Sequence, residues 1–264
     1  MSQIEDMLRK ELDSGMPEAA RFNRALRLLA KHRSLLIQNE LMKKHGTIVQ
    51  GGPFAGMNYI ENSAEGCHIP KLLGCYEQEL HPFVTSVPQR RYQTILNIGS
   101  AEGYYAVGFK RLCPDAMVLA CDTDSNAQSA CKALAERNNV NLDIRGTFAP
   151  GDFAAHTGRT LVWCDIEGGE RTLLNPVLAP QLAKMDIVVE LHPSADAPDI
   201  RVVPARFAQT HDIAIVWPDL NRMKLPDMFK NFGHLDQLLA VWEWRSTPTP
   251  WAIMISKAGA QAGK

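Results

Sequence analysis

The sequence lacks the features that would assign it at once to a nucleic-acid-binding, membrane or secreted class. Its net charge is only −1, so the composition indicates no basic surface that would attract a nucleic acid or an anionic membrane. No stretch approaches the roughly 18 apolar residues of a membrane span. The start, MSQIEDMLRKELDSG, has no apolar core of the kind found in signal peptides. We therefore expect a cytoplasmic protein whose partner is a small-molecule substrate.

The six cysteines form no C-x-x-C pair. Zinc sites and redox motifs use such close pairs, and disulfide frameworks belong to short secreted chains. We interpret the cysteines as free thiols in a reducing compartment: Cys67, Cys75, Cys113, Cys121, Cys131 and Cys164. A chain of 264 residues is long enough for one large domain, or for one domain plus an appendage.

Residues 17–45 predict one long helix. Pro17 suits the first turn and Gly46 suits the C-cap. Four apolar residues mark one face: Phe22, Leu26, Leu29 and Leu36. A helix this apolar must pack on something. Packing on the chain's own core is the expectation, and the alternative is a homodimer through this N-terminal helix.

Two shorter segments follow. Residues 47–60 are broken by glycines and predict an extended segment or hairpin, and residues 70–81 predict a short helix that opens with Pro70. We assign residues 1–46 to an N-terminal helical segment, 47–91 to a cap on the substrate side and 92–264 to the ligand-binding domain.

From Tyr92 onward, predicted strands and helices alternate, which indicates an α/β sheet. The predicted strands are 94–98, 117–121, 141–145, 160–164, 186–190, 212–217 and 251–256. The predicted helices are 103–112, 125–138, one from Gly169, 199–209 and 234–241. Five strand–helix units followed by two further strands predict a Rossmann-like, seven-stranded, mostly parallel sheet with a reversed last strand.

The loop after the first of these strands suits an adenosine-type ligand. Gly99 and Gly103 permit a tight turn and a close backbone approach, and an acid, Asp122, ends the next strand where a ribose diol would lie. Ala101 replaces the middle glycine that admits a pyrophosphate. Glu102 would add like-charge repulsion to a pyrophosphate. The loop therefore favours S-adenosylmethionine over a dinucleotide, while a tight turn without a ligand is the plainer alternative.

These residues carry a resemblance. NIGSAEGYY and CDTD resemble the first two motifs of class I S-adenosylmethionine-dependent methyltransferases, and the match to the class covers about 92–256. WCDIEGGE (163–170) and VVELH (188–192) are similar to the branch related to FkbM-type methyltransferases. The segment PKLLGCYE and the tail WEWRSTPTPW resemble a bacterial group within that branch. One departure is Asn97, where many class members carry an acid that helps to hold the methionine amine.

The resemblance implies a role for each matched position. Gly99 and Gly103, with Asn97 and Ser100, lie along the methionine moiety. Asp122, next to Thr123, takes the ribose, and Thr147 or Phe148 lies near the adenine. Asp165 faces the sulfonium, where a carboxylate stabilises the positive charge.

The acceptor side gathers where the fourth and fifth strands of the sheet end, because adjacent parallel strands end at one edge. Asp165, Glu167, Glu170, Glu190 and His192 meet there. His192 is the proposed general base, since its ordinary pKa is near 6.5. The alternative is a structural histidine at the strand end. Glu190 and Asp165 are the other catalytic candidates, as groups that orient the substrate.

A divalent cation is a further option at this cluster. Carboxylates suit magnesium or calcium, and carboxylates with histidine suit manganese, iron or zinc. The spacing does not demand a metal, so we expect none.

Two outer segments are expected to shape the acceptor pocket. Lys71, Tyr76 and Glu77 are polar positions on the short apolar helix, and the plainer interpretation is a solvated face. Trp244 and Arg245 sit in a tryptophan-rich tail, where Arg245 would clamp an anionic group. The plainer interpretation of the tail is core tryptophans and a surface ion pair.

The sequence thus predicts an S-adenosylmethionine-dependent methyltransferase acting on an oxygen or nitrogen of a small polar metabolite. Two alternatives remain: a nicotinamide-dependent oxidoreductase, and a non-catalytic dimeric partner protein that keeps the fold.

Overall fold

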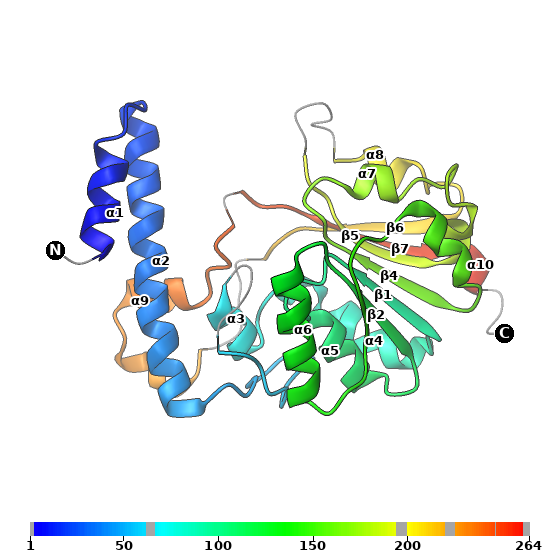
Figure 1. The fold of residues 1–264 in the computed structure, drawn as a ribbon, viewed down its shortest axis with the longest axis horizontal. Coiled ribbons are helices and arrows are strands. Elements are labelled where there is room, and N and C mark those ends of the chain that lie inside the picture. Colours follow the sequence, from blue (N-terminus) through cyan, green and yellow to red (C-terminus); the bar gives the residue numbers. More distant parts are fainter. Residues whose placement is uncertain (1–2, 62–66, 194–199, 220–224, 246, 261–264) are drawn as a thin grey trace.

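A seven-stranded sheet forms the centre of the molecule in a computed structural model that describes residues 3–61, 67–193, 200–219, 225–245 and 247–260 (Figure 1). The strand order is β3-β2-β1-β4-β5-β7-β6. The strands are β1 (Thr94–Ile98), β2 (Met117–Cys121), β3 (Asp143–Arg145), β4 (Thr160–Cys164), β5 (Asp186–Glu190), β6 (His211–Val216) and β7 (Trp251–Ser256). Strand β7 is antiparallel to both of its neighbours, and the other pairs are parallel. The predicted Rossmann-like sheet with a reversed last strand is confirmed.

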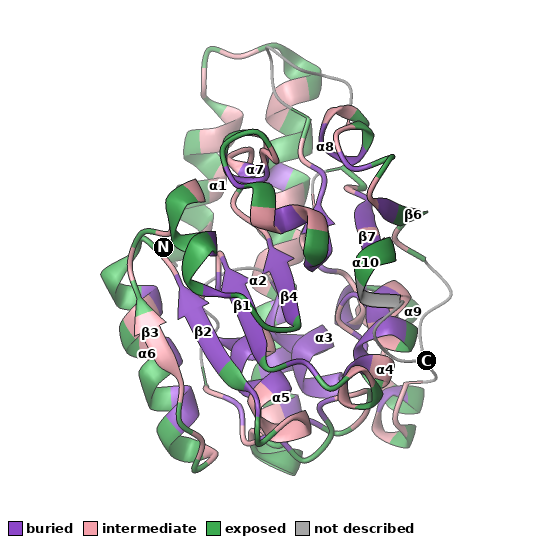
Figure 2. Cartoon of the chain, turned by 90° about the vertical axis from the view of Figure 1, so that its right-hand side faces the viewer, coloured by how far each residue is buried: buried purple, intermediate pink, exposed green. Residues whose placement is uncertain are grey.

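The central strands are buried along their whole length, as Figure 2 shows. Parallel strands are covered on both faces and therefore carry nearly continuous apolar runs. Alternate residues enter two separate cores: Ile95 and Trp163 belong to one, while Leu96 and Val162 belong to the other.

Longer helices cover the first core and shorter ones the second. The first face carries α4 (His81–Arg90), α5 (Tyr104–Leu112) and α6 (Ser125–Arg137). The second carries η2 (Pro150–Ala155), α7 (Glu170–Leu173), η3 (Pro180–Lys184) and α8 (Val202–Ala205). The helix predicted at 199–209 is therefore shorter than expected, and its first residue lies outside the described ranges. Helix α10 (Lys257–Ala260) follows β7 directly.

The first helices stand apart from the sheet as an arm (Figure 1). It consists of α1 (Gln3–Leu12), a separate helix inside the segment 1–46 that was expected to be helical, and the predicted long helix α2 (Glu18–His45). The four-residue stripe expected to pack on the core is 43–66% exposed. The buried residues of α2 are instead Ala25, Ser34, Ile37, Gln38 and Leu41. The four-residue stripe therefore does not pack on the core, and α2 contacts the core through the side that carries Ile37 and Leu41.

The chain between the arm and the sheet is tightly folded. Residues 47–60, expected to be an extended segment or hairpin, fold back on themselves through one antiparallel bridge between Ile48 and Asn58. The helix predicted at 70–81 is only α3 (His68–Leu73), because Gly74 takes a left-handed conformation against the carbonyl of Gly51. Then η1 (Gln78–Leu80) leads into α4, whose Pro82 lies in the first turn. Proline is tolerated there because that N–H needs no helical partner.

Near the C-terminus, η4 (Asp227–Asn231) and α9 (His234–Ala240) pack beside α2. The strap, defined here as residues 241–250, connects α9 to β7, with residue 246 outside the described ranges. Across the described ranges, no helix combines the length and the apolar character that a membrane crossing requires.

Candidate functional site

A cavity of about 340 Å³ lies where β1, β4 and β5 end. This edge of the sheet is where ligands bind in open α/β folds. Asn97, Trp163, Glu190 and Trp251 are almost fully buried lining residues. The rest of the lining comes from α2, from residues 71–77, from the loop that opens α5, from the end of β4 and from the strap.

The loop between β1 and α5 is built for close approach. Gly99 has φ 77°, and a Cβ there would lie 1.5 Å from the carbonyl oxygen of Asp165. Gly103 has φ 88°, and a Cβ there would lie 2.5 Å from Sγ of Cys131. Neither position tolerates a side chain, so the glycines bring β1 and β4 together and start α5.

Asp122 shapes this loop from the end of β2. Its Oδ2 accepts the N–H of Ala101 at 2.8 Å, and its Oδ1 accepts the N–H of Asp124 at 2.9 Å. The first bond holds Ala101 in a left-handed conformation, φ 44°, which an alanine adopts at a cost of roughly 1–2 kcal/mol. Each carboxylate oxygen retains a lone pair for a further donor.

Two orphaned polar atoms lie at the loop. Asn97 Oδ1 and Ser100 Oγ are buried and have no hydrogen-bond partner among the described residues. Both residues line the cavity and are at most 5% exposed. A buried polar atom without a partner costs about 1–3 kcal/mol, so such atoms indicate a missing ligand or water. An amine and a carboxylate, as in the methionine end of S-adenosylmethionine, fit an acceptor and a hydroxyl at this position.

The negative charge of Glu102 is balanced by a neighbouring lysine. Its carboxylate is fully buried and receives Lys71 Nζ at 2.5 Å and the hydroxyl of Tyr59. Although burial opposes it, Lys71 lowers the pKa of Glu102. The expected repulsion of a pyrophosphate by Glu102 is therefore weaker than the sequence suggested, and Lys71, expected to bind substrate, is engaged with Glu102.

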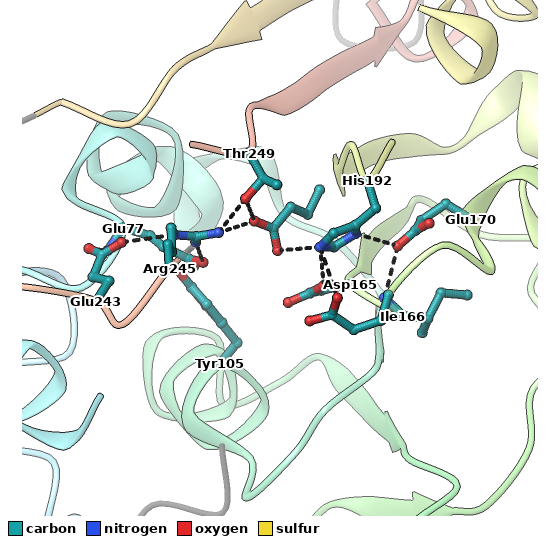
Figure 3. A network of polar contacts seen from close by, with 11 residues as sticks. Glu77, Tyr105, Asp165, Ile166, Glu170, His192, Glu243, Arg245 and Thr249 are labelled. Atoms are coloured by element: carbon teal, nitrogen blue, oxygen red, sulfur yellow. Dashed lines mark hydrogen bonds and ion pairs between the residues drawn. The ribbon is translucent and has the colours of Figure 1, made fainter. Parts of the chain in front are cut away.

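Arg245 is surrounded by carboxylates of the protein itself (Figure 3). Its guanidinium donates to Glu77 at 2.5 Å, to Glu243 at 3.1 Å and to Glu190. Thr249 bridges the same site by donating to Glu190 at 2.5 Å. Burial, with Glu190 and Glu243 nearby, raises the pKa of Glu77 to about 8. A substrate anion would have to compete with the carboxyl groups of three residues, so Arg245 holds the strap to β5 and to residue 77.

His192 is held in one orientation (Figure 3). Its Nδ1 lies 3.0 Å from Oε1 of Glu170, an oxygen that also accepts the N–H of Ile166. Since a carboxylate only accepts, Nδ1 carries a proton, and the lone pair of neutral His192 is on Nε2. Burial opposes protonation, but the bond to Glu170 and the nearby carboxylates raise the pKa of His192.

The Nε2 atom faces three more carboxylates. It lies 3.4 Å from Glu167, 3.5 Å from Glu190 and 3.9 Å from Asp165. Burial and the neighbouring Glu190 raise the pKa of Asp165. Ligand atoms of Asp165, Glu190 and His192 all lie within 4.8 Å of one another, which is compatible with a cation. Asp165, Glu167 and Glu190 line the cavity, whereas His192 lies beside it.

The remaining expected positions divide into two groups. Tyr76 and Trp244 line the cavity. Thr123, Thr147 and Phe148 lie outside its lining, and Phe148 packs on Phe153 with ring centres 4.9 Å apart. The sequence missed Arg27 and Lys31, which line the cavity from α2. The sequence placed Glu170 in the acidic cluster but missed its bond to His192, and it missed the role of Glu243, an acid two residues before Arg245.

No family model and no curated protein matches this chain. Solved structures match its fold at low identity. A human methyltransferase 10 domain containing protein is 11% identical with a TM-score of 0.47, covering 86% of this chain and 96% of that one. A methyltransferase from Pyrococcus furiosus is 10% identical with a TM-score of 0.44, covering 85% and 97%. Precorrin-6y C5,15-methyltransferase from Geobacter metallireducens is 12% identical with a TM-score of 0.44, covering 66% and 88%. Similarity this distant carries no information about what this chain binds.

Proposed function

We propose that the chain is an S-adenosylmethionine-dependent methyltransferase that methylates an oxygen or nitrogen of a small polar metabolite. The observation that carries the proposal is the loop at the end of β1. Its glycines admit no side chain, Asp122 fixes its backbone, and the buried atoms Asn97 Oδ1 and Ser100 Oγ lack partners beside the cavity. Such a site supplies acceptors and hydroxyls for an amino acid moiety without a phosphate cradle.

The residues would divide the cofactor between them. Asn97, Gly99, Ser100 and Gly103 hold the methionine end. Asp122, with Thr123, binds the ribose, and Thr147 and Phe148 flank the adenine. When bound, S-adenosylmethionine supplies a methyl group on a positively charged sulfur. Asp165, which lines the cavity and has a buried oxygen without a hydrogen-bond partner among the described residues, would face that charge.

The acceptor must lose a proton as it is methylated. Glu190 and Asp165 reach the cavity, and His192 Nε2 lies behind them at 3.5 and 3.9 Å. In the proposed step, a proton leaves the acceptor through one of these carboxylates and ends on Nε2 of His192. Glu170 keeps that nitrogen turned toward the cavity side, which places the base without movement at the moment of reaction.

Calorimetry on the intact chain tests the proposal. S-adenosylhomocysteine should bind with a 1:1 stoichiometry, and NADH should produce no heat of binding and no energy transfer from tryptophan. Binding of NADH in place of S-adenosylhomocysteine would support the oxidoreductase alternative. A chain that binds neither would support the non-catalytic partner protein.

A further inference from the structure

Two cationic residues on α2 remain to be explained at the cavity. Arg27 and Lys31 lie one helical turn apart, so their side chains share a face. Both line the cavity and are half-buried, whereas Trp163, Glu190 and Trp251 in the same lining are at most 3% exposed. They therefore form part of the rim rather than the floor.

The other cations of the cavity are engaged with carboxylates. Lys71 is paired with Glu102, and Arg245 is paired with Glu77, Glu190 and Glu243. Within the described ranges, neither Arg27 nor Lys31 has a carboxylate within ion-pair distance. Two positive charges thus stand at the rim of a cavity whose interior is rich in acids.

Both residues are held in place by the strap. Arg27 donates to the carbonyl of Trp244 at 2.9 Å and to that of Arg245 at 3.4 Å, and it lies over the ring of Trp242. Lys31 Nζ lies 4.9 Å from the ring centre of Trp244. A guanidinium has five N–H donors and an ammonium has three, so both residues keep donors for a ligand.

We infer that Arg27 and Lys31 form an anion subsite at the rim, and that the acceptor carries a carboxylate or phosphate group bound there. The acceptor would lie with its anionic end against α2 and its reacting oxygen or nitrogen toward Asp165 and Glu190. The identity of the ligand as an acceptor rests on the proposed function, whereas the anion subsite itself does not.

The test follows the indole N–H signal of Trp244 by NMR in the intact chain loaded with S-adenosylhomocysteine. Trp244→Phe assigns the signal among the five tryptophans. The titrants are inorganic phosphate and, separately, acetate, at low ionic strength because salt screens exposed charges. We expect a saturable shift with a dissociation constant near 1 mM, which corresponds to about 4 kcal/mol. Comparison of the two titrants shows which anionic group the subsite prefers.

Matched variants separate the subsite from general surface charge. Lys31→Met and Arg27→Met should each weaken binding at least about fivefold, the effect of losing one charge-assisted hydrogen bond. Lys44→Met and Arg24→Met lie on the same helix, are exposed and are absent from the cavity lining, and should leave binding unchanged.

Three results would overturn the inference: no saturable shift, equal loss in the control variants, or weakening of S-adenosylhomocysteine rather than of the anion by Lys31→Met. In the last case the cations serve the cofactor. If the wild-type chain does not bind S-adenosylhomocysteine, the proposed function fails, and the same titrations on the free chain still decide the anion subsite.

Discussion

Oε1 of Glu170 accepts hydrogen bonds from both Nδ1 of His192, at 3.0 Å, and the backbone N–H of Ile166, at 3.1 Å. Glu170 starts α7 directly after the loop that follows β4, and His192 follows β5. The bond thus ties two neighbouring strand ends together. It also decides which nitrogen of His192 is able to take a proton.

This relationship predicts the pH dependence of turnover. Because the pKa of His192 is raised, the neutral base becomes available only at a pH above its ordinary value of about 6.5. The rate should therefore rise with pH through that higher value. Glu170→Gln removes the charge that favours protonation and should move the rising limb to lower pH. The profile of kcat against pH measures the midpoint of this rise, and Glu136→Gln, at an exposed position, is the control. If Glu170→Gln leaves the midpoint where it is in the wild type, His192 is excluded as the base.

The same pair predicts a change in stability with pH. The raised pKa means that folding favours the protonated form, so the contribution of His192 is complete below about pH 6.5 and is lost as pH rises through the folded-state value. Urea unfolding across this range should show that loss in the wild type and a smaller one in Glu170→Gln.

Asp122 should control cofactor affinity. Asp122→Ala leaves the N–H groups of Ala101 and Asp124 without their acceptor and frees the loop. We expect S-adenosylhomocysteine to bind at least about tenfold more weakly, equivalent to roughly 1.4 kcal/mol. Calorimetry measures the affinity for S-adenosylhomocysteine, and Asp115→Ala, at an exposed position, is the control. Equal affinities in both variants would show that the loop does not hold the cofactor.

The buried pair of Lys71 and Glu102 should be costly to break from one side. Lys71→Met leaves the Glu102 carboxylate buried without its ion-pair partner, and removing one member of a buried pair costs roughly 3–5 kcal/mol. Adding Glu102→Leu should recover part of that loss. Urea unfolding provides the measurement, and Lys230→Met, in an exposed pair with Asp227, should change little. Additive losses in the double variant would contradict the coupling.

Turnover should survive chelation of divalent metals. The carboxylates of the cluster already have partners within the protein: Glu190 is bound by Arg245 and Thr249, and Asp165 and Glu167 face His192. We expect the same rate in saturating EDTA as in buffer. A loss that magnesium, manganese or zinc restores would instead make Asp165, Glu190 and His192 metal ligands.

The uncovered stripe on α2 predicts a homodimer. Phe22 and Leu26 are 56% and 66% exposed on an arm that projects from the sheet, and large apolar side chains gathered on one surface are typical of an interface. Light scattering should give a mass of two chains for the wild type, and Leu26→Glu should reduce the measured mass to that of one chain. Leu178→Glu, at an exposed apolar residue elsewhere, is the control. A monomer at every concentration would contradict the prediction.

Local patterns were enough to predict the sheet and the tight glycine turn after β1. Strands such as β1 and β4 are short apolar runs, and the glycines after β1 mark a turn whose geometry depends on adjacent residues. The position of Asp122 follows from the strand that it ends. These features required no knowledge of distant contacts.

Contacts between distant segments escaped prediction. Arg245 suggested a clamp for an anion because its partners, Glu77 and Glu190, lie far away in the sequence. Nothing in the sequence singled out Arg27 and Lys31, because only the folded chain places α2 beside the cavity. Glu102 seemed a free charge until Lys71 was found beside it.

The strap has a consequence for synthesis. Arg245 binds Glu77 across 168 residues and Glu190 across 55, and the carbonyl of Trp244 receives Arg27 across 217. A chain emerging from the ribosome has completed the loop between β1 and α5 and the strands up to β5 before the strap exists. The cavity wall is finished only when the last of these residues folds back. Until then the growing chain has an open sheet edge at β5 and an incomplete cavity, so the cavity is the last part of the fold to be finished.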